Sequence, residues 1–246
     1  MRRLDDVRRR LAADPARRAW YHRLRRPALL AARRSTEPLS HDWGFERGTP
    51  VDRYYIGRFL ERHRGDIRGR VLEVKDDAYT RRYGSGVERA DVLDVDAANP
   101  RATVVADLTL ADGVPEDAFD CFVLTQTLQL IYDVAAVAGH AHRMLAPGGV
   151  LLVTVPAVSR LAGPPDSYPD HWRFTGASAR RLFEDAFGAG NVEVRTEGNA
   201  LAGAAFLLGM AAEELGPRRL DAADPAHPVL VTVRAVKAPG ASASAI

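Results

Sequence analysis

Three short stretches decide the fold: Val71-Leu72-Glu73-Val74, Val87-Glu88-Arg89-Ala90-Asp91 and Ala102-Thr103-Val104-Val105-Ala106-Asp107. Each is an apolar run with an acidic residue at or near its end, and their spacing suits strand–helix–strand units of a parallel sheet. The carboxyl ends of parallel strands meet at one edge of the sheet, which is where such folds bind nucleosides. We therefore expect Glu73, Asp91 and Asp107 to converge at that edge.

Further apolar runs extend the pattern along the chain. The expected strands are 71–74, 87–92, 103–106, 119–124, 149–155, 192–195 and 228–234. The expected helices are one within 40–70 and others near 78–84, 128–145, 178–187 and 200–215. Strands that alternate with helices predict an α/β fold: a doubly wound, Rossmann-like, mostly parallel seven-stranded sheet with helices on both faces.

Composition indicates a globular chain. It has 246 residues, of which 46% are hydrophobic and 27% charged, and these values are typical of folded domains. We expect one α/β domain over 40–237, a basic arm over 1–39 and a disordered tail over 238–246. Cys121 is the only cysteine, so no internal disulfide can form. No apolar run reaches membrane-spanning length, and a cytoplasmic protein is expected.

The arm is strongly basic. Residues 1–34 contain twelve arginines against three aspartates, so the arm could hold nucleic acid, an anionic membrane surface or an acidic partner. The alternative is a pair of short amphipathic helices with a solvated basic face, broken near Pro15 and Pro27. No recognised nucleic-acid-binding motif is present, and nucleic acid is not the expected partner.

Several motifs together carry a family resemblance. Phe119-Asp120 opens the fourth strand and Pro147-Gly148-Gly149 precedes the fifth. With the strand-end acids, these motifs resemble class I S-adenosylmethionine-dependent methyltransferases over roughly residues 50–235. The segment 170–175 is similar to one in methyltransferases of small molecules and sugars. Residues 43–55 and 79–84 look like methyltransferase-type domains that accompany bacterial polysaccharide glycosyltransferases.

The resemblance implies S-adenosylmethionine as the cofactor. Asp91 is expected to bind the ribose hydroxyls, with Asp94 and Asp96 as competitors, and Asp107 with Leu108 is expected to face adenine. Glu73 would hold the following loop or contact the methionine amino group. The expected cofactor residues are Glu73, Val74, Lys75, Tyr79, Asp91, Val92, Asp107, Leu108, Thr125 and Gln126. No metal ligand is predicted.

The loop after the first strand departs from the family pattern. It contains no glycine before Gly84, although glycine normally lets the backbone approach the cofactor closely. Two accounts remain open. Lys75 pairs with the cofactor carboxylate, or its side chain fills the pocket and the cofactor no longer binds.

Methyl transfer is an in-line displacement, so the protein needs mainly to align the acceptor and remove its proton. His171, flanked by Asp170, is the candidate base, and the alternative is a surface loop histidine. Aromatic faces suit sugar rings, and arginines suit phosphate or carboxylate. Candidate acceptor residues, each with a structural alternative, are Arg47, Arg53, Tyr54, Tyr55, Trp172 and Arg173.

These observations predict an S-adenosylmethionine-dependent O-methyltransferase acting on a saccharide, glycoconjugate or small natural product. One alternative is a catalytically inactive methyltransferase-like domain that binds or scaffolds a glycosyltransferase partner. Another is a nucleic-acid methyltransferase that uses the basic arm, although the chain lacks a base-methylation motif.

Overall fold

The structure is a computed structural model that describes residues 20, 36–162 and 169–239. The expected arm helices within 1–34 lie outside these residues, as do most of the predicted disordered tail and part of the expected loop 157–171. Contacts divide the chain into two compact units. Unit 1 comprises residues up to Tyr55, Val158–Arg160 and Glu197–Val229, and unit 2 comprises Ile56–Ala157, Leu161–Thr196 and residues from Leu230 onward.

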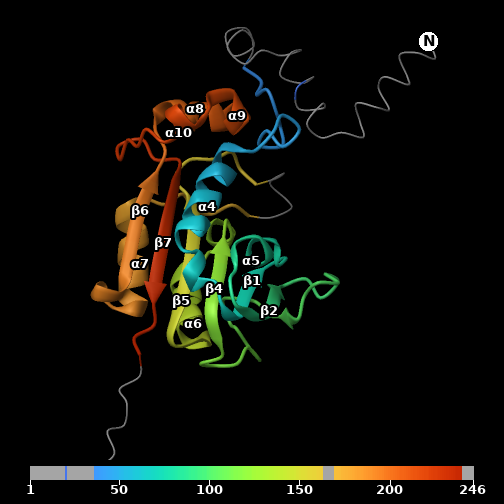
Figure 1. The fold of residues 1–246 in the computed structure, drawn as a ribbon, viewed down its shortest axis with the longest axis vertical. Helices are drawn as coiled ribbons and strands as arrows, with labels where there is room; N and C mark the ends of the chain where they lie inside the picture. Colours follow the sequence, from blue (N-terminus) through green and yellow to red (C-terminus); the bar gives the residue numbers. More distant parts are fainter. Residues whose placement is uncertain (1–19, 21–35, 163–168, 240–246) are drawn as a thin grey trace, which may run out of the picture. The chain divides into compact units, whose positions relative to one another are not determined.

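A seven-stranded sheet forms the centre of unit 2 (Figure 1). The strands lie in the order β3-β2-β1-β4-β5-β7-β6. Their bounds are β1 Gly69–Val74, β2 Val87–Asp94, β3 Val104–Val105, β4 Phe119–Thr125, β5 Leu145–Pro156, β6 Val192–Glu197 and β7 Leu230–Val236. Strands β1 to β5 pair in parallel, and β7 runs antiparallel to β5. The prediction of a seven-stranded Rossmann-like sheet is confirmed, with the addition that the sheet is mixed.

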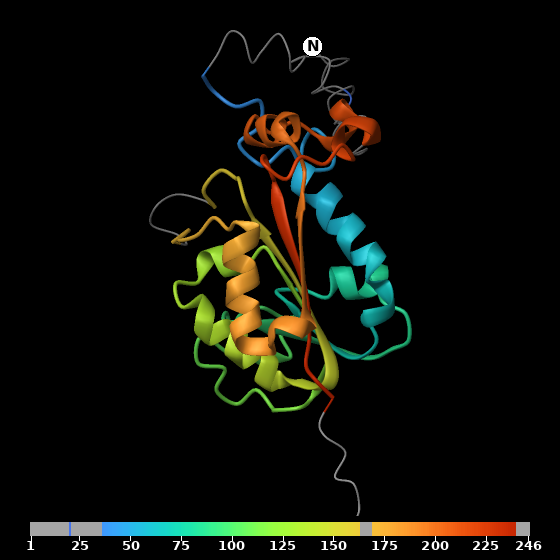
Figure 2. The same ribbon diagram turned by 90° about the vertical axis from the view of Figure 1, so that its left-hand side faces the viewer.

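Helices cover both faces of this sheet (Figure 2). Helices α6 (Val134–Met144) and α7 (Gly176–Phe187) lie on one face. Helix α5 (Ala78–Tyr83) lies on the other, with the part of α4 (Val51–Arg62) that belongs to unit 2. Gly57 of α4 allows close packing there, because a Cβ at this position would stand 2.8 Å from the Tyr83 hydroxyl.

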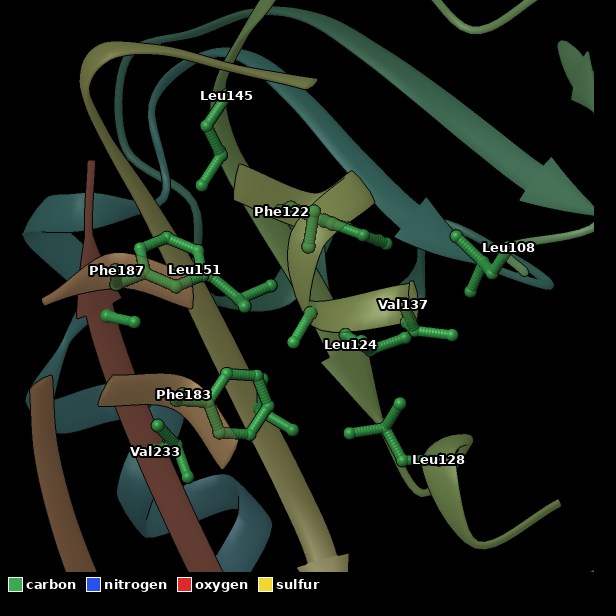
Figure 3. Packing of buried hydrophobic residues seen from close by; sticks show 14 of the residues in the cluster. Leu108, Phe122, Leu124, Leu128, Val137, Leu145, Leu151, Phe183, Phe187 and Val233 are labelled. Atoms are coloured by element: carbon green, nitrogen blue, oxygen red, sulfur yellow. The ribbon is translucent and has the colours of Figure 1, made fainter. Parts of the chain in front are cut away.

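The core of unit 2 lies between the sheet and helices α6 and α7. Leu124 of β4, Leu151 of β5 and Phe183 of α7 are fully buried and face one another (Figure 3). Helix α7 presents its apolar stripe because Thr175 caps its first turn: the Thr175 hydroxyl accepts from the Ser178 amide at 3.0 Å. Burial of such side chains stabilises the fold by about 1.5–3 kcal/mol each.

Unit 1 is built on three short helices: α8 (Ala200–Leu207), α9 (Ala212–Leu215) and α10 (Pro217–Leu220). The buried guanidinium of Arg47 holds Glu214 through two hydrogen bonds, of 3.0 and 2.6 Å. Gly209 ends α8 because its backbone is left-handed, with φ +70°. A Cβ there would also collide with Ser40.

Two expected helices are each split in the structure. The predicted helix over 128–145 consists of a 3-10 turn η2, Leu128–Leu130, followed by α6. The Asp133 carboxylate accepts from the Ala136 amide at 2.9 Å and starts α6 there. The predicted helix over 200–215 is divided into α8 and α9, with Gly209 between them.

Candidate functional site

Two neighbouring central strands are each followed by a residue whose backbone is strained. Lys75 directly follows β1 with φ 75°, and Gln126 directly follows β4 with φ 48°. Left-handed backbone costs a residue with a side chain roughly 1–2 kcal/mol. Such strain persists where the surroundings enforce it, and it gathers at ligand sites. The carboxyl edge of the sheet is therefore the candidate site.

The backbone of Lys75 is held on both sides. Its amide donates to the Leu93 carbonyl at 2.8 Å, and its carbonyl accepts from the Asn99 side chain at 2.8 Å. These bonds hold a left-handed backbone that normally favours glycine, although the residue is lysine. The Lys75 side chain is exposed, which counts against the account in which it fills a pocket.

Glu73 clamps the loop that follows β1. Its buried carboxylate accepts from the amides of Tyr79 and Thr80 at 3.0 and 2.7 Å, and from the Thr80 hydroxyl at 2.7 Å. These donors belong to the first turn of α5, where a helix has unpaired amides. Burial raises the pKa of Glu73 to about 7, against the effect of the hydrogen bonds. The loop-holding role expected for Glu73 matches these contacts, whereas Tyr79 contributes its amide here and stacks its ring on Tyr83.

Asp91 does not lie at the end of its strand, so the expected position was wrong. Strand β2 continues to Asp94, and Asp91 and Val92 lie inside it, opposite Leu72 and Glu73 of β1. The buried Asp91 carboxylate instead accepts from Arg70 at 2.7 Å and from Arg89 at 2.9 Å. Although burial opposes it, hydrogen bonds from Arg70, Arg89 and Thr103 hold the pKa of Asp91 below its usual range.

Asp94 occupies the position that was expected of Asp91. It is the last residue of β2, and its half-buried carboxylate accepts from the Asp96 amide at 3.0 Å and from the Asn99 side chain at 2.7 Å. Asn99 also binds the Lys75 carbonyl, so one amide side chain ties the ends of β1 and β2 together. A carboxylate has about four acceptor sites, and Asp94 keeps some of them available.

Asp107 follows β3 and is exposed, and the adjoining Leu108 is buried. Its carboxylate accepts from the Thr109 amide and hydroxyl at 2.8 and 2.7 Å, and these bonds lower its pKa. Asp107 therefore caps the turn and keeps part of its carboxylate exposed.

Unsatisfied polar atoms gather where β4 and β5 end. Among the described residues, the buried side-chain atoms without a hydrogen-bond partner are Gln126 Nε2, Gln129 Oε1 and Thr154 Oγ1. Gln129 Nε2 donates to the Gln126 carbonyl at 2.9 Å, which orients its amide and leaves Oε1 on the other side. Unpaired buried polar groups cost about 1–3 kcal/mol each, and a ligand that supplied both a donor and an acceptor would remove that cost. Thr125, the last residue of β4, pairs with Thr154 in the ladder.

Aromatic rings adjoin these polar atoms. The Gln129 carbonyl accepts from the His171 amide at 2.7 Å and from the Trp172 amide at 3.3 Å, which joins the segment after β5 to the segment after β4. The Tyr132 ring lies 5.4 Å from the His171 ring and 5.6 Å from the Trp172 ring. Tyr132 is 71% exposed and His171 is exposed as well, so the cluster presents ring surface to solvent.

Asp170 does not orient His171. Its carboxylate is held by the Arg173 guanidinium through bonds of 2.5 and 3.0 Å, and by the Ala162 amide at 3.0 Å. Arg173 thus forms the structural ion pair that was the alternative to acceptor binding, and the expected role of Asp170 beside the base stays a prediction. Trp172 is anchored through its indole N–H, which donates to the carbonyls of Ile131 and Tyr132.

The remaining expected acceptor residues belong to unit 1. Arg47 is buried against Glu214, and Arg53 lies 3.5 Å from the Asp52 carboxylate. The Tyr54 hydroxyl donates to Asp221, and the buried Tyr55 hydroxyl donates to the Leu220 carbonyl. These contacts give each residue a partner within unit 1, and acceptor binding by these residues stays a prediction.

The sequence did not indicate Gln129 or Tyr132 as site residues. It favoured Asp91 over Asp94 as the residue that binds the ribose. The signal for Asp94 was the length of β2, which continues three residues beyond Asp91. Tyr132 and Gln129 fell inside an expected helix, where they had no reason to stand out. Within the described residues, no group of His, Cys, Asp and Glu is arranged to hold a metal ion. A helix long and apolar enough to cross a membrane is also absent from that part of the chain.

Comparisons with known proteins agree with this geometry. Residues 76–153 match the family model described as a methyltransferase domain, and no curated protein sequence matches the chain. The fold resembles that of the [4+2]-cyclase SpnF, with a TM-score of 0.52, 18% identity, and coverage of 79% of this chain and 84% of the other.

Two methyltransferase structures are also similar. A Haemonchus contortus N-methyltransferase in complex with S-adenosylhomocysteine has a TM-score of 0.50 and 14% identity, over 78% of this chain and 54% of that one. A methyltransferase from Archaeoglobus fulgidus has a TM-score of 0.47 and 11% identity, over 75% and 94%. At these identities the cyclase and the Haemonchus contortus enzyme show the fold alone. By the family match, residues 76–153 carry a methyltransferase domain, and S-adenosylmethionine is its cofactor.

The described residues fit this cofactor at three points. The backbone at Lys75 takes the glycine-like conformation, Asp94 presents a carboxylate at the end of β2, and Gln126 Nε2 is a buried donor that needs an acceptor. A ribose diol, an amino-acid carboxylate and an ammonium group are the kinds of partner that these atoms accept.

Proposed function

We propose that the protein methylates an oxygen of a saccharide, glycoconjugate or small natural product. The observation that carries this proposal is that the Gln129 carbonyl binds the amides of His171 and Trp172. This joins a segment with unpaired buried side-chain atoms, on Gln126 and Gln129, to a cluster of exposed rings. Polar hydroxylated molecules suit such a surface, because rings pack on sugar faces while amides bind hydroxyls.

In this proposal the cofactor lies along the edge formed by β1, β2 and β4. Asp94 binds the ribose hydroxyls, Asp107 and Leu108 border the adenine, and Gln126 Nε2 donates to the methionine carboxylate beside Val74 and Thr125. Glu73 supports the loop rather than touching the cofactor, since its carboxylate accepts its hydrogen bonds from Tyr79 and Thr80. The exposed Lys75 ammonium adds positive charge near that carboxylate.

His171 serves as the base for the acceptor. When bound, S-adenosylmethionine supplies a methyl group activated by its sulfonium. The protein positions the acceptor hydroxyl and removes its proton, and positioning provides most of the acceleration. The bond from the His171 amide to the Gln129 carbonyl fixes its main chain, and Tyr132 supports the imidazole from the side.

The test measures S-adenosylhomocysteine formation by the full-length chain with a panel of mono- and oligosaccharides. His171→Gln should lower kcat by about 10²–10⁴ and leave the Kd of S-adenosylhomocysteine unchanged. His227→Gln is the matched control, because His227 is an exposed histidine of unit 1 paired with Asp224. Equal turnover by His171→Gln and the wild type would reject His171 as the base.

A scaffold that partners a glycosyltransferase is the second candidate. Its support is that a [4+2]-cyclase shares this fold, so the fold alone does not determine the reaction. Cofactor binding without turnover on any hydroxyl acceptor would favour it, as would a stable complex with a glycosyltransferase. The predicted cytoplasmic location belongs to both candidates.

A further inference from the structure

Unit 1 contains an open cavity of about 580 Å³. It is lined by Asn199, Leu201, Arg218, Arg219 and Ala222. None of these residues belongs to the cofactor or acceptor residues proposed above, and all of them lie within one compact unit. Ligand sites of small molecules commonly enclose about 300–1,000 Å³, so the size of this cavity suits a small ligand.

Asn199 fixes the walls of the cavity. Its side-chain oxygen accepts from the Ala202 amide at 2.9 Å and starts α8. Its side-chain nitrogen donates to the carbonyls of Arg219 and Ala222 at 2.8 and 2.6 Å, and so holds the end of α10 beside the start of α8. The cavity is therefore a defined feature of the fold, since a single amide sets both sides of it.

Two arginines supply the charge of the cavity. Arg218 and Arg219 are exposed, and neither forms an ion pair with a carboxylate of the described residues. Arg219 donates to the Leu215 carbonyl at 3.0 Å, which leaves most of its donors available. The nearby Asp221 accepts from the Tyr54 hydroxyl, and Asp224 pairs with His227. An arginine fork of this kind matches phosphate and carboxylate geometry.

An apolar wall stands beside these charges. Leu201 is 52% exposed, and the exposed face of α8 continues through Ala204 to Leu207, which is 45% exposed. Helix α8 contains no charged residue. A helix that is apolar on all sides is normally buried, so the exposed face of α8 indicates an apolar partner.

We propose that this cavity binds an anionic amphiphile: a phosphate or carboxylate head on Arg218 and Arg219, with an alkyl chain along Leu201 and the exposed face of α8. The head group would pair with the two guanidinium groups, and the chain would cover apolar surface now in contact with water. The ligand could come from an anionic lipid bilayer or from a soluble alkyl phosphate, because the two share this chemistry.

Calorimetric titration of the full-length chain with decyl phosphate, below its micelle concentration, tests the proposal. Arg218→Gln/Arg219→Gln should weaken decyl phosphate at least about tenfold, and Leu201→Gln should weaken it while leaving inorganic phosphate unaffected. Leu161→Gln and Arg101→Gln are the matched controls. Leu161 is an exposed leucine and Arg101 an exposed arginine, and both belong to unit 2, away from the lining of the cavity in the sequence.

Cosedimentation with phosphatidylglycerol vesicles distinguishes the two sources. Loss of vesicle binding in the double arginine variant would identify a bilayer lipid. Loss of decyl phosphate binding alone would identify a soluble ligand. The proposal is overturned if wild type does not bind decyl phosphate, if it binds inorganic phosphate equally well, or if the double variant binds like Arg101→Gln. Affinity for S-adenosylhomocysteine in every variant provides the folding check.

Discussion

At the scale of single residues, Lys75 and Gln126 shape the sheet edge at which we propose that the cofactor binds, without the expected glycine. Both residues adopt a left-handed backbone at the ends of adjacent central strands. Lys75 is held in that conformation because its amide donates to the Leu93 carbonyl and its carbonyl accepts from the Asn99 side chain. The loop therefore has the backbone shape that a glycine would give, and the strain of this conformation lowers the stability of the fold.

Replacing Lys75 by glycine tests this account. Lys75→Gly should raise the free energy of unfolding by about 1 kcal/mol, because glycine adopts a positive φ without a steric penalty. Urea denaturation measures the change. Lys75→Ala is the control, since it removes the charge and keeps the Cβ. Equal stabilisation by both variants would assign the effect to charge instead of backbone.

Substitutions of Asp91 and Asp94 should have different effects, one on stability and the other on cofactor affinity. Asp91→Ala should destabilise the fold by about 1–3 kcal/mol, since it removes the buried acceptor of Arg70, Arg89 and Thr103. It should leave the Kd of S-adenosylhomocysteine unchanged. Asp94→Ala should raise that Kd by about tenfold or more through lost ribose hydrogen bonds. Thermal unfolding and calorimetry measure the two effects, and weaker cofactor binding by folded Asp91→Ala would reverse this assignment.

At the scale of elements, apolar runs were sufficient to locate all seven strands, because buried parallel strands are nearly continuous in hydrophobic residues. Their ends were less predictable. The sequence predicted that the second strand ends near Asp91. Inside the sheet, however, Arg70 of β1 and Arg89 of β2 form ion pairs with Asp91. The sequence predicted one helix over 128–145, so the turn that carries Gln129 and Tyr132 was not recognised. Helix α6 starts only after the cap at Asp133, which hydrophobic periodicity does not reveal.

The clamp of Glu73 on α5 should make stability depend on pH. Burial raises the folded pKa of Glu73 to about 7 from 4.5, so the folded state binds the extra proton between these values. Stability should therefore fall as pH rises from about 4.5 to 7, by at most about 3 kcal/mol. Denaturation across this range should show a shallower slope for Glu73→Gln. Glu88→Gln, at an exposed position of β2, should keep the wild-type slope.

At the scale of the whole molecule, the two proposed binding sites belong to different compact units. Unit 2 holds the sheet edge with Asp94, Gln126 and His171, and unit 1 holds the cavity with Arg218 and Arg219. Unit 1 is assembled from segments that lie on both sides of most of unit 2 in the sequence. No local sequence pattern predicts that these segments form one unit, because the unit depends on long-range contacts. One example is the pair of Arg47 and Glu214, which are 167 residues apart.

The interior place of β7 affects how the protein is made. Strand β7 is the last strand in the chain, yet it lies between β5 and β6. Until residues 230–236 leave the ribosome, a nascent chain carries β5 with a bare apolar edge and β6 without a neighbour. Exposed edges of this kind favour aggregation. Termination before residue 230 should therefore yield insoluble chains, because β5 and β6 then lack the strand that lies between them.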